Sequence, residues 1–280
     1  TAFWINTGHA MPAGTNAVIM IEHLNIQDDH TIQIEAPVFP WQNVRKMGED
    51  IVATELLFPR GHRITAYSMG ALLSGGIFRV KVHQLPRVLI VPTGSELVQW
   101  HQVTPDQMMP GDVIESNSHV LGALCRDHGA QFDIHPMLKD DLETIEASIQ
   151  AAAQKKYDMI CIIGGSSAGS ADFAKPVLQN LGELYVHGVT MMPGKPVMFG
   201  KISGIPVFGI PGYPVSAIVA FEQFAGPLLL NMQKQPPLEP VELDVSPARN
   251  MASKLGQVEF LRVKLGSVDG RVVASALPRG

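Results

Sequence analysis

Short apolar runs alternate with helical patterns between residues 87 and 232, and this alternation constrains the fold more than any other feature. Four runs predict strands because they are apolar throughout or alternate with a period of two: RVLIVPTG at 87–94, QFDIHPML at 131–138, YDMICIIGG at 157–165 and IPVFGIPG at 205–212. Three segments carry apolar residues at helical spacing: 116–129, 140–156 and 215–230. Strands and helices in this succession predict an α/β fold with a doubly wound, mostly parallel sheet.

Three loops that follow predicted strands are rich in glycine and other small residues: PTGSEL at 92–97, IIGGSSAGSAD at 162–172 and IPGYPVSA at 210–217. Ligands of doubly wound sheets bind at the carboxyl ends of the strands, so we expect the three loops to face one crevice. Small residues let backbone N–H groups approach a phosphate closely. The 162–172 loop matches neither the Walker A nor the G-x-G-x-x-G pattern, so a plain strand-to-helix turn is the equal alternative.

Candidate phosphate-binding residues lie in these loops and in two further segments. The 162–172 loop offers backbone and hydroxyl donors at Gly164, Gly165, Ser166, Ser167, Gly169 and Ser170. The other two loops contribute Gly94, Ser95 and Gly212, and the two further segments contribute Asn117 and Lys195. Lys195 lies in a Pro-Gly-Lys-Pro turn, which positions a lysine better than an open surface does and suits a phosphate. The alternative for Lys195 is a solvated turn lysine.

Four carboxylates are candidate catalytic groups: Asp50, Glu96, Asp140 and Asp172. The last three fall at strand ends or helix starts of the predicted sheet. Mg²⁺ sites that also hold phosphates use one or two carboxylates plus water, and we assign Glu96 and Asp172 to such a site. For each acid taken alone, a helix N-cap is the competing interpretation, and Asp140 or Asp141 is expected to cap the helix that follows.

Composition narrows the class of protein. The net charge is −5 and no basic run occurs, which argues against nucleic-acid binding. No uninterrupted apolar run reaches about 18 residues, so no membrane span is expected, and the N-terminus does not resemble a signal peptide. The two cysteines, Cys125 and Cys161, lie in apolar patterns and are predicted to be buried, reduced thiols rather than a disulfide or metal site.

The flanking regions differ from the 87–232 segment. Before it, 16–24 and 30–38 predict short alternating strands, and 48–76 predicts a turn followed by a helix. After it, 236–250 is proline-rich and predicts a linker, and 257–277 predicts two strands around an Asp-Gly turn. The chain lacks an initiator Met and ends directly after a strand-like run, so we expect a fragment of a longer protein.

Several motifs in order resemble one family. They are TGHAMPAGTNAVIMIEH at 7–23, NVRKMGEDI at 43–51, LPRVLIVPTGSELV at 85–98, ESNSHVLGALCRDHGA at 115–130, YDMICIIGGSSAGSADF at 157–173, PGKPVMFG at 193–200 and IPGYPVSA at 210–217. Together they cover nearly the whole chain and resemble molybdopterin molybdenumtransferase, the MoeA family, which is similar to the gephyrin E domain. An ordered set of this kind is far more specific than any one of its motifs.

The resemblance implies four parts: 1–40 as the end of a β-rich second domain, 41–86 as an elongated dimerisation segment, 87–235 as the molybdopterin-binding domain, and 236–280 as the start of a C-terminal β domain. It implies a cytoplasmic homodimer that inserts molybdate into adenylylated molybdopterin and releases AMP with Mg²⁺ or a similar cation. Molybdoenzymes or other proteins of the cofactor pathway are implied partners. Asp50, Glu96, Asp140, Asp172 and Lys195 stand at the positions of the family's functional acids and lysine.

The chain departs from the family pattern at several positions. Ser95 replaces the aspartate of Thr-Gly-Asp-Glu-Leu, Met192 replaces the first lysine of Lys-Pro-Gly-Lys-Pro, and Tyr213 replaces the asparagine of Pro-Gly-Asn-Pro. The glycine-serine loop is altered from Ile163 onward, and the family's N-terminal Met-Asp-Gly segment does not occur. Two alternatives therefore stay open: a non-catalytic pterin-binding or scaffold protein with the same fold, and a phosphohydrolase on the same sheet.

Overall fold

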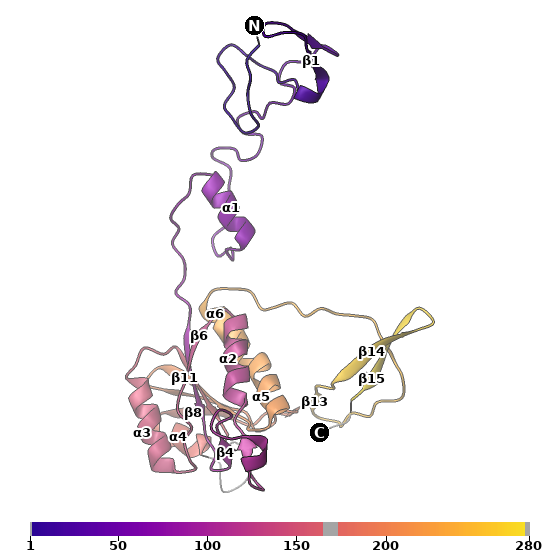
Figure 1. Cartoon of the computed structure of the whole chain (residues 1–280). Helices are drawn as coiled ribbons and strands as arrows, with labels where there is room; N and C mark the ends of the chain where they lie inside the picture. The colour runs from indigo at the N-terminus through magenta and orange to yellow at the C-terminus, as the bar shows by residue number, and fades with distance from the viewer. Residues whose placement is uncertain (1, 165–172, 278–280) are drawn as a thin grey trace. The chain divides into compact units, whose positions relative to one another are not determined.

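The computed structural model describes residues 2–164 and 173–277. The chain divides into two compact units, Thr1–Lys81 and Val82–Gly280. Each unit has its own helices and strands (Figure 1).

A six-stranded sheet forms the centre of the second unit, with the strand order β6-β3-β7-β11-β10-β8. Its strands are β3 Arg87–Pro92, β6 Gln131–Ile134, β7 Met159–Ile163, β8 Glu183–His187, β10 Met198–Ile202 and β11 Ile205–Ile210. The first four strands in the order are parallel, and β10 runs antiparallel to both β11 and β8. The predicted α/β fold with a mostly parallel sheet is confirmed, and the antiparallel edge was not predicted.

Helices cover both faces of this sheet, as expected of a doubly wound fold (Figure 1). One face carries α2 Asn117–Asp127 and a continuous stretch made of α5 Pro214–Ala220, the π-helical segment η3 Phe221–Ala225 and α6 Gly226–Met232. The other face carries α3 Leu142–Ala153 and α4 Ala174–Leu181. All of these helices except α4 lie in segments whose periodicity predicted a helix.

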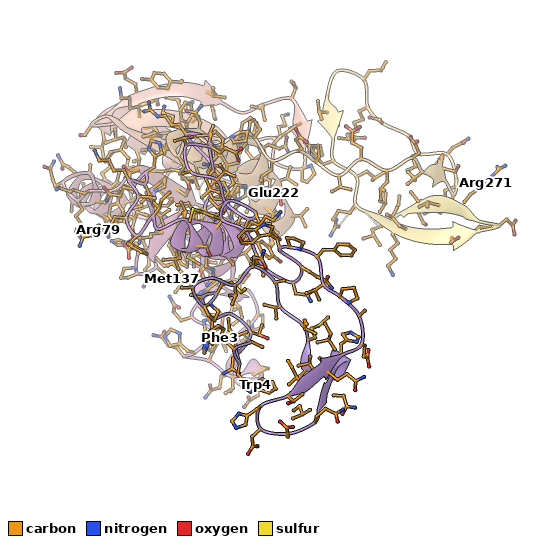
Figure 2. All side chains as sticks on the ribbon, turned by 90° about the horizontal axis from the view of Figure 1, so that it is seen from above. Phe3, Trp4, Arg79, Met137, Glu222 and Arg271 are labelled. Carbon is orange, nitrogen blue, oxygen red and sulfur yellow. The ribbon has the colours of Figure 1, made fainter. Side chains whose placement is uncertain are left out.

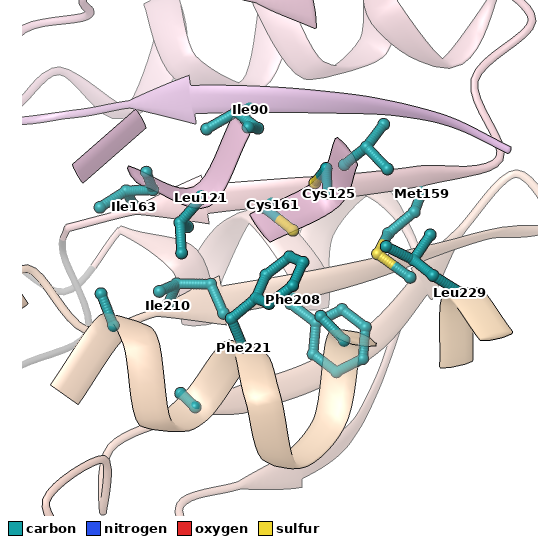
Figure 3. Close-up of a cluster of buried hydrophobic side chains, with 14 of the residues drawn as sticks. Ile90, Leu121, Cys125, Met159, Cys161, Ile163, Phe208, Ile210, Phe221 and Leu229 are labelled. Carbon is teal, nitrogen blue, oxygen red and sulfur yellow. The ribbon is translucent and has the colours of Figure 1, made fainter. Parts of the chain in front are cut away.

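Two hydrophobic clusters hold the layers together. Alternate residues of each strand feed opposite clusters: Val88 and Ile90 join the α2 side, and Leu89 joins the α3 side. Figure 3 shows the α2-side cluster, in which Phe208 of the sheet faces Phe221 of η3, a side chain with no exposed surface. Each fully buried side chain of this size contributes about 1.5–3 kcal/mol through the hydrophobic effect.

Both cysteines belong to the α2-side cluster and are fully buried (Figure 3). Burial raises the pKa of the Cys125 thiol to about 12 and raises that of Cys161 well above its ordinary value. Because the thiolate is the reactive species, both groups are inert in the native fold. The prediction of buried, unpaired thiols is confirmed.

One helical stretch, Pro214–Met232, is long and apolar enough to cross a membrane by length and composition alone. Its buried side chains, Ala217, Ala220, Phe221 and Leu229 among them, pack against the sheet in the α2-side cluster. The apolar character of this stretch is therefore accounted for by its place in the core.

Smaller elements flank the sheet. A two-residue parallel ladder joins β4 Leu97–Val98 to β5 Val113–Ile114, with the 3-10 helix η2 Pro105–Gln107 between them. A three-stranded sheet contains β12 Ser246–Pro247, β14 Val263–Val268 and β15 Arg271–Ala276. A second two-residue parallel ladder joins β9 Met191–Met192 to β13 Val258–Glu259.

The C-terminal hairpin differs in part from its prediction. Strands β14 and β15 pair around Asp269 and Gly270, as the Asp-Gly signal indicated. The N-terminal residues of the predicted first strand do not belong to the hairpin, however, because Val258 and Glu259 pair with β9 instead of β15. Alternation of polar and apolar residues identifies an extended segment but not the strand with which it pairs.

The N-terminal unit contains η1 Ile21–His23, β1 Leu24–Ile26, β2 Ile32–Ile34 and α1 Ala66–Ser74. Strand β2 and helix α1 lie where they were predicted. The strand predicted at 16–24 is wrong over most of its length, because Val18 bonds to Gln42 and Asn43 in a turn instead of joining a ladder. Only Ser68 is buried among residues 2–81.

Candidate functional site

Strands β3, β7 and β11 end at the same end of the sheet, and beyond β7 the structure describes Gly164. The Thr93 N–H and hydroxyl both donate to the Ile163 carbonyl, at 2.8 and 3.0 Å. The Gly164 N–H donates to the Ile210 carbonyl at 3.0 Å. These bonds extend the parallel pairing one residue beyond β3 and β7, so Thr93 lies beside β7 and Gly164 beside Ile210 where the strands end.

Gly164 occupies the most crowded position at this edge. Its φ is +93°, and a Cβ atom there would lie 2.4 Å from the Thr93 carbonyl oxygen. A Cβ on Gly212 would lie 3.7 Å from the Gly164 Cα. Glycine is therefore required at 164 by the backbone of β3 itself, with or without a ligand.

Asn117 ties the first turn of α2 to the loop after β11. Its side-chain amide donates to the Gly212 carbonyl at 2.6 Å. The carboxylate of Glu115, which is buried, accepts from the Ser118 N–H at 2.8 Å and so caps the same helix. Ser116, a capping type by sequence, makes no such bond. The N-terminus of α2 is thereby fixed beside Gly212.

Asp140 and Ser95 hold each other through a reciprocal pair of bonds. The Ser95 N–H donates to the Asp140 carboxylate at 3.1 Å, and the Asp140 N–H donates to the Ser95 hydroxyl at 3.2 Å. The cap of α3 is the next residue, Asp141, which accepts from the Thr144 N–H at 2.9 Å. Hydrogen bonds from the Thr144 side chain and backbone lower the pKa of Asp141. The two adjacent acids thus have separate tasks.

Glu96 is an exposed carboxylate next to Gly94. A Cβ on Gly94 would lie 2.9 Å from both Glu96 carboxylate oxygens. The Glu96 carbonyl accepts from the Val113 N–H at 2.9 Å, which holds this residue in the β4–β5 ladder. Gly94 in turn donates to the Leu138 carbonyl at 3.0 Å, so the loops after β3 and β6 also meet. Glu96 and Asp140 therefore belong to one connected group of loops.

Lys195 lies in a tight turn that packs on α5. The Lys195 carbonyl accepts from the Val189 N–H at 2.9 Å, and the Val197 N–H donates to the Gly194 carbonyl at 3.1 Å. Gly194 has a φ of +101°, and a Cβ there would lie 3.5 Å from the Ser216 carbonyl in the first turns of α5. The Lys195 side chain is exposed.

Several predicted site residues are not brought together by the structure. Asp50 is exposed and belongs to the other unit. Part of the predicted set lies outside the described residues: Gly165, Ser166, Ser167, Gly169, Ser170 and Asp172. Within the described ranges, no cluster of three or more His, Cys, Asp or Glu residues could hold a metal ion.

Two residues of this edge were missed by the sequence analysis. Thr93 is 3% exposed and links β3 to β7 through both of its donors. Glu115 is equally buried and positions α2. A usable signal existed only for Glu115, since an acid three residues before Ser118 fits a helix start.

The comparisons with known proteins agree with this geometry. Residues 89–231, which include the six-stranded sheet and its helices, match the family described as "Probable molybdopterin binding domain", and residues 1–76 match "MoeA N-terminal region (domain I and II)". The chain belongs to the MoeA family. The resemblance inferred from the ordered motifs is thereby confirmed.

Individual relatives support the same assignment. A molybdopterin molybdenumtransferase of Haemophilus influenzae is 33% identical over 94% of this chain, and molybdopterin molybdenumtransferase 2 of Mycobacterium tuberculosis is 32% identical over 99%. The crystal structure of a molybdopterin biosynthesis MoeA protein from Pyrococcus horikoshii superposes with a TM-score of 0.73 at 31% identity, covering 94% of this chain.

These relatives are longer than the chain described here. The chain spans 64% of the Haemophilus protein, 69% of the Mycobacterium protein and 63% of the Pyrococcus chain. The family and the fold are therefore established for these 280 residues.

Proposed function

We propose that this protein is a molybdopterin molybdenumtransferase, which inserts molybdate into adenylylated molybdopterin and releases AMP. The observation that carries the proposal is the end of the sheet at which Thr93, Gly164 and Ile210 lie together, in a chain of the MoeA family. Relatives named for this activity favour it over a non-catalytic scaffold. A cytoplasmic location is part of the proposal, and two free, buried thiols fit a reducing compartment.

The ligand phosphate is proposed to lie against the backbone that follows β7. Gly164 brings this backbone within van der Waals reach of the β3 loop, and Gly212 and Gly94 carry no side chain where the neighbouring loops leave the sheet. Asn117 holds the Gly212 loop in place. Lys195 adds a positive charge, which suits a phosphate as a point-charge partner. Gly165, Ser166, Ser167 and Gly169 are proposed to complete the cradle.

A divalent cation, Mg²⁺ or a similar ion, is proposed to join the carboxylates to the phosphate. Glu96 and Asp140 belong to the same group of loops, and carboxylates repel an anionic ligand unless a cation intervenes. One or two carboxylates plus water suffice for such an ion, so Glu96 and Asp172 are its proposed ligands. Asp140 is oriented by Ser95 and is proposed to act beside them, and Asp50 keeps its proposed catalytic role.

The working form is proposed to be a homodimer, with other proteins of the cofactor pathway as partners. The N-terminal unit supports this, because many of its large apolar side chains are exposed and a second copy would cover them. The parts 1–40, 41–86, 87–235 and 236–280 are proposed as end of the second domain, dimerisation segment, pterin-binding domain and start of the C-terminal domain.

The test is molybdate-dependent release of AMP from adenylylated molybdopterin by the full-length protein. Asp140→Asn should reduce the rate at least tenfold, because it removes a negative charge next to the proposed cation. Asp141→Asn is the matched control: it changes the adjacent acid in the same way, but Asn caps a helix as well as Asp does, so the rate should stay within twofold. Tight ligand binding without AMP release would instead establish a scaffold.

A further inference from the structure

A strand from the C-terminal segment pairs directly with the residues that precede the Lys195 turn. The Val258 N–H donates to the Thr190 carbonyl at 2.9 Å, and the Phe260 N–H donates to the Met192 carbonyl at 2.8 Å. These two bonds enclose the β9–β13 ladder, in which Glu259 lies opposite Met192. The turn that carries Lys195 starts at that same residue, Met192.

The turn is therefore held by contacts on two sides. On one side Gly194 packs on α5: a Cβ atom added to Gly194 would lie 3.5 Å from the Ser216 carbonyl oxygen and 3.7 Å from the Ala220 nitrogen. On the other side β13 holds the strand that enters the turn. The helix belongs to the α/β layer, but β13 comes from beyond the predicted linker. A segment outside the pterin-binding domain thus shapes a loop of the proposed site.

Phe260 anchors this strand by more than its N–H group. Its side chain is half-buried and packs against the core cluster that includes Met191 and Val197, the residues on either side of the turn. In contrast, every residue from 236 to 256 is exposed. The chain crosses a long exposed stretch and then binds the α/β layer at Val258–Phe260.

We propose that Val258–Phe260 is a positioning element for Lys195, so that the C-terminal segment sets how well the lysine binds the ligand phosphate. This rests on the proposed function, which gives Lys195 that role. A lysine on a loose turn loses conformational entropy when it binds, whereas a turn fixed in advance has already lost it. Phe260 acts through the backbone of Met192 and touches no ligand in this proposal.

The test is a set of affinities for adenylylated molybdopterin, measured on the full chain by equilibrium ultrafiltration. Phe260→Pro removes the N–H that bonds to Met192, and Phe260→Ala is its control, because it also removes the ring but keeps the N–H. Lys195→Met should weaken binding about tenfold, the effect of one lost charge-assisted contact. Phe260→Pro, which loses both the ring and the N–H, should weaken it about fivefold, and Phe260→Ala, which loses only the packing of the ring, by about twofold.

The double variant Phe260→Pro, Lys195→Met decides whether the effect runs through the lysine. If it does, the double variant binds within twofold of Lys195→Met alone, because neighbours that act as a unit are not additive. Hydrogen exchange should accelerate at the amides of 189–197 in Phe260→Pro and stay unchanged in β7, which also shows that the sheet is folded.

The outcomes separate the two proposals. Normal binding by Phe260→Pro, or effects that multiply in the double variant, would overturn the positioning role while Lys195 keeps its own. Normal binding by Lys195→Met would overturn the assigned role of the lysine and the positioning role with it. Failure of the unaltered protein to bind adenylylated molybdopterin would overturn the proposed function itself.

Discussion

The α/β layer and the N-terminal unit have similar fractions of apolar residues in their sequences but use them in opposite ways. In the α/β layer, β7 is buried along its whole length and two hydrophobic clusters line the sheet. In the N-terminal unit, only Ser68 is buried among residues 2–81. Large side chains there are mostly exposed, including Phe39 and, labelled in Figure 2, Phe3 and Trp4.

The difference shows that apolar composition does not itself make a core. Residues 87–232 have periodic patterns, and each pattern gives an element one face to bury. The N-terminal unit has few regular elements, so its apolar residues share no common face. Its stability must come from surfaces outside the unit, which is the physical basis for proposing a second copy of the chain.

The largest effect is expected when the regions are separated. A fragment of residues 82–280 should unfold in one cooperative transition, because its core is internal. A fragment of residues 1–81 should show no cooperative transition, because ordering its backbone is not offset by burial. Circular dichroism during heating measures both. A sharp thermal transition in the N-terminal fragment would contradict the claim that this unit lacks a core of its own.

A single core substitution sharpens the same contrast. Phe221→Ala should lower the free energy of unfolding by about 3–5 kcal/mol, because it opens a cavity in the fully buried α2-side cluster. Tyr67→Ala, at a residue 90% exposed in the N-terminal unit, should change it by less than about 0.5 kcal/mol. Urea titration of the full chain measures both. Equal effects would contradict the view that only one region has a core.

Backbone packing within the α/β layer gives the next effect. Gly164→Ala should cost about 3 kcal/mol, because a side chain is strained at its φ of +93° and meets the Thr93 carbonyl at 2.4 Å. Gly204→Ala is the matched control, with a φ of +89° and open space around its Cβ, and should cost only about 1–2 kcal/mol. Similar losses of stability in the two variants would mean that the backbone at Thr93 moves to make room for the new side chain.

A smaller effect concerns the acid that caps α3. The pKa of Asp141 is lowered in the folded state, so its contribution is present above its unfolded pKa and is lost as the pH falls through the folded value. Stability should therefore decline on acidification below about pH 4, and Asp141→Asn should decline less over that range. Thermal unfolding of both proteins between pH 5 and 2 measures this difference. If the melting temperatures of the two proteins fall in parallel, Asp141 makes no pH-dependent contribution to stability.

The smallest effect is expected from thiol reagents. Cys125 and Cys161 are buried, and the pKa of Cys125 is raised to about 12, so neither offers a reactive thiolate at neutral pH. Mass spectrometry after mild alkylation should find both unlabelled in the native protein and labelled in urea. Rapid labelling of either cysteine in the native protein would show that the α2-side cluster opens to solvent.

The fold was predictable where one element's pattern sufficed. The strands at 87–94 and 205–212 and the helix at 116–129 were recognisable from periodicity alone, and the order of loops indicated where the site lies. Two strands of the six-stranded sheet, β8 and β10, were missed, because Glu183–His187 is mostly exposed and Met198–Ile202 follows a turn whose proline and glycine dominate its pattern.

The common end of strands β3, β7 and β11 was predictable from the sequence, but the contacts made there were not. The Ser95–Asp140 pair joins residues 45 positions apart, and the Asn117–Gly212 bond joins residues 95 apart. Neither residue type nor spacing reveals such a partner. Asp140 and Asp141 were equal candidates for the helix cap, and the structure assigns that task to Asp141, since Asp140 is taken up by Ser95.

The place of β13 along the chain has a consequence for synthesis. Every strand of the six-stranded sheet lies before residue 211, so the sheet has all its strands once that part has left the ribosome. Strand β13, which pairs with the residues that enter the Lys195 turn, follows about 50 residues later. At usual elongation rates of roughly 5–20 residues per second, a nascent chain spends several seconds with a finished sheet and an unfinished loop. Helices α5 and α6 complete the core during that interval, so the growing protein has its sheet and core before β13 can fix the turn that is proposed to bind the ligand.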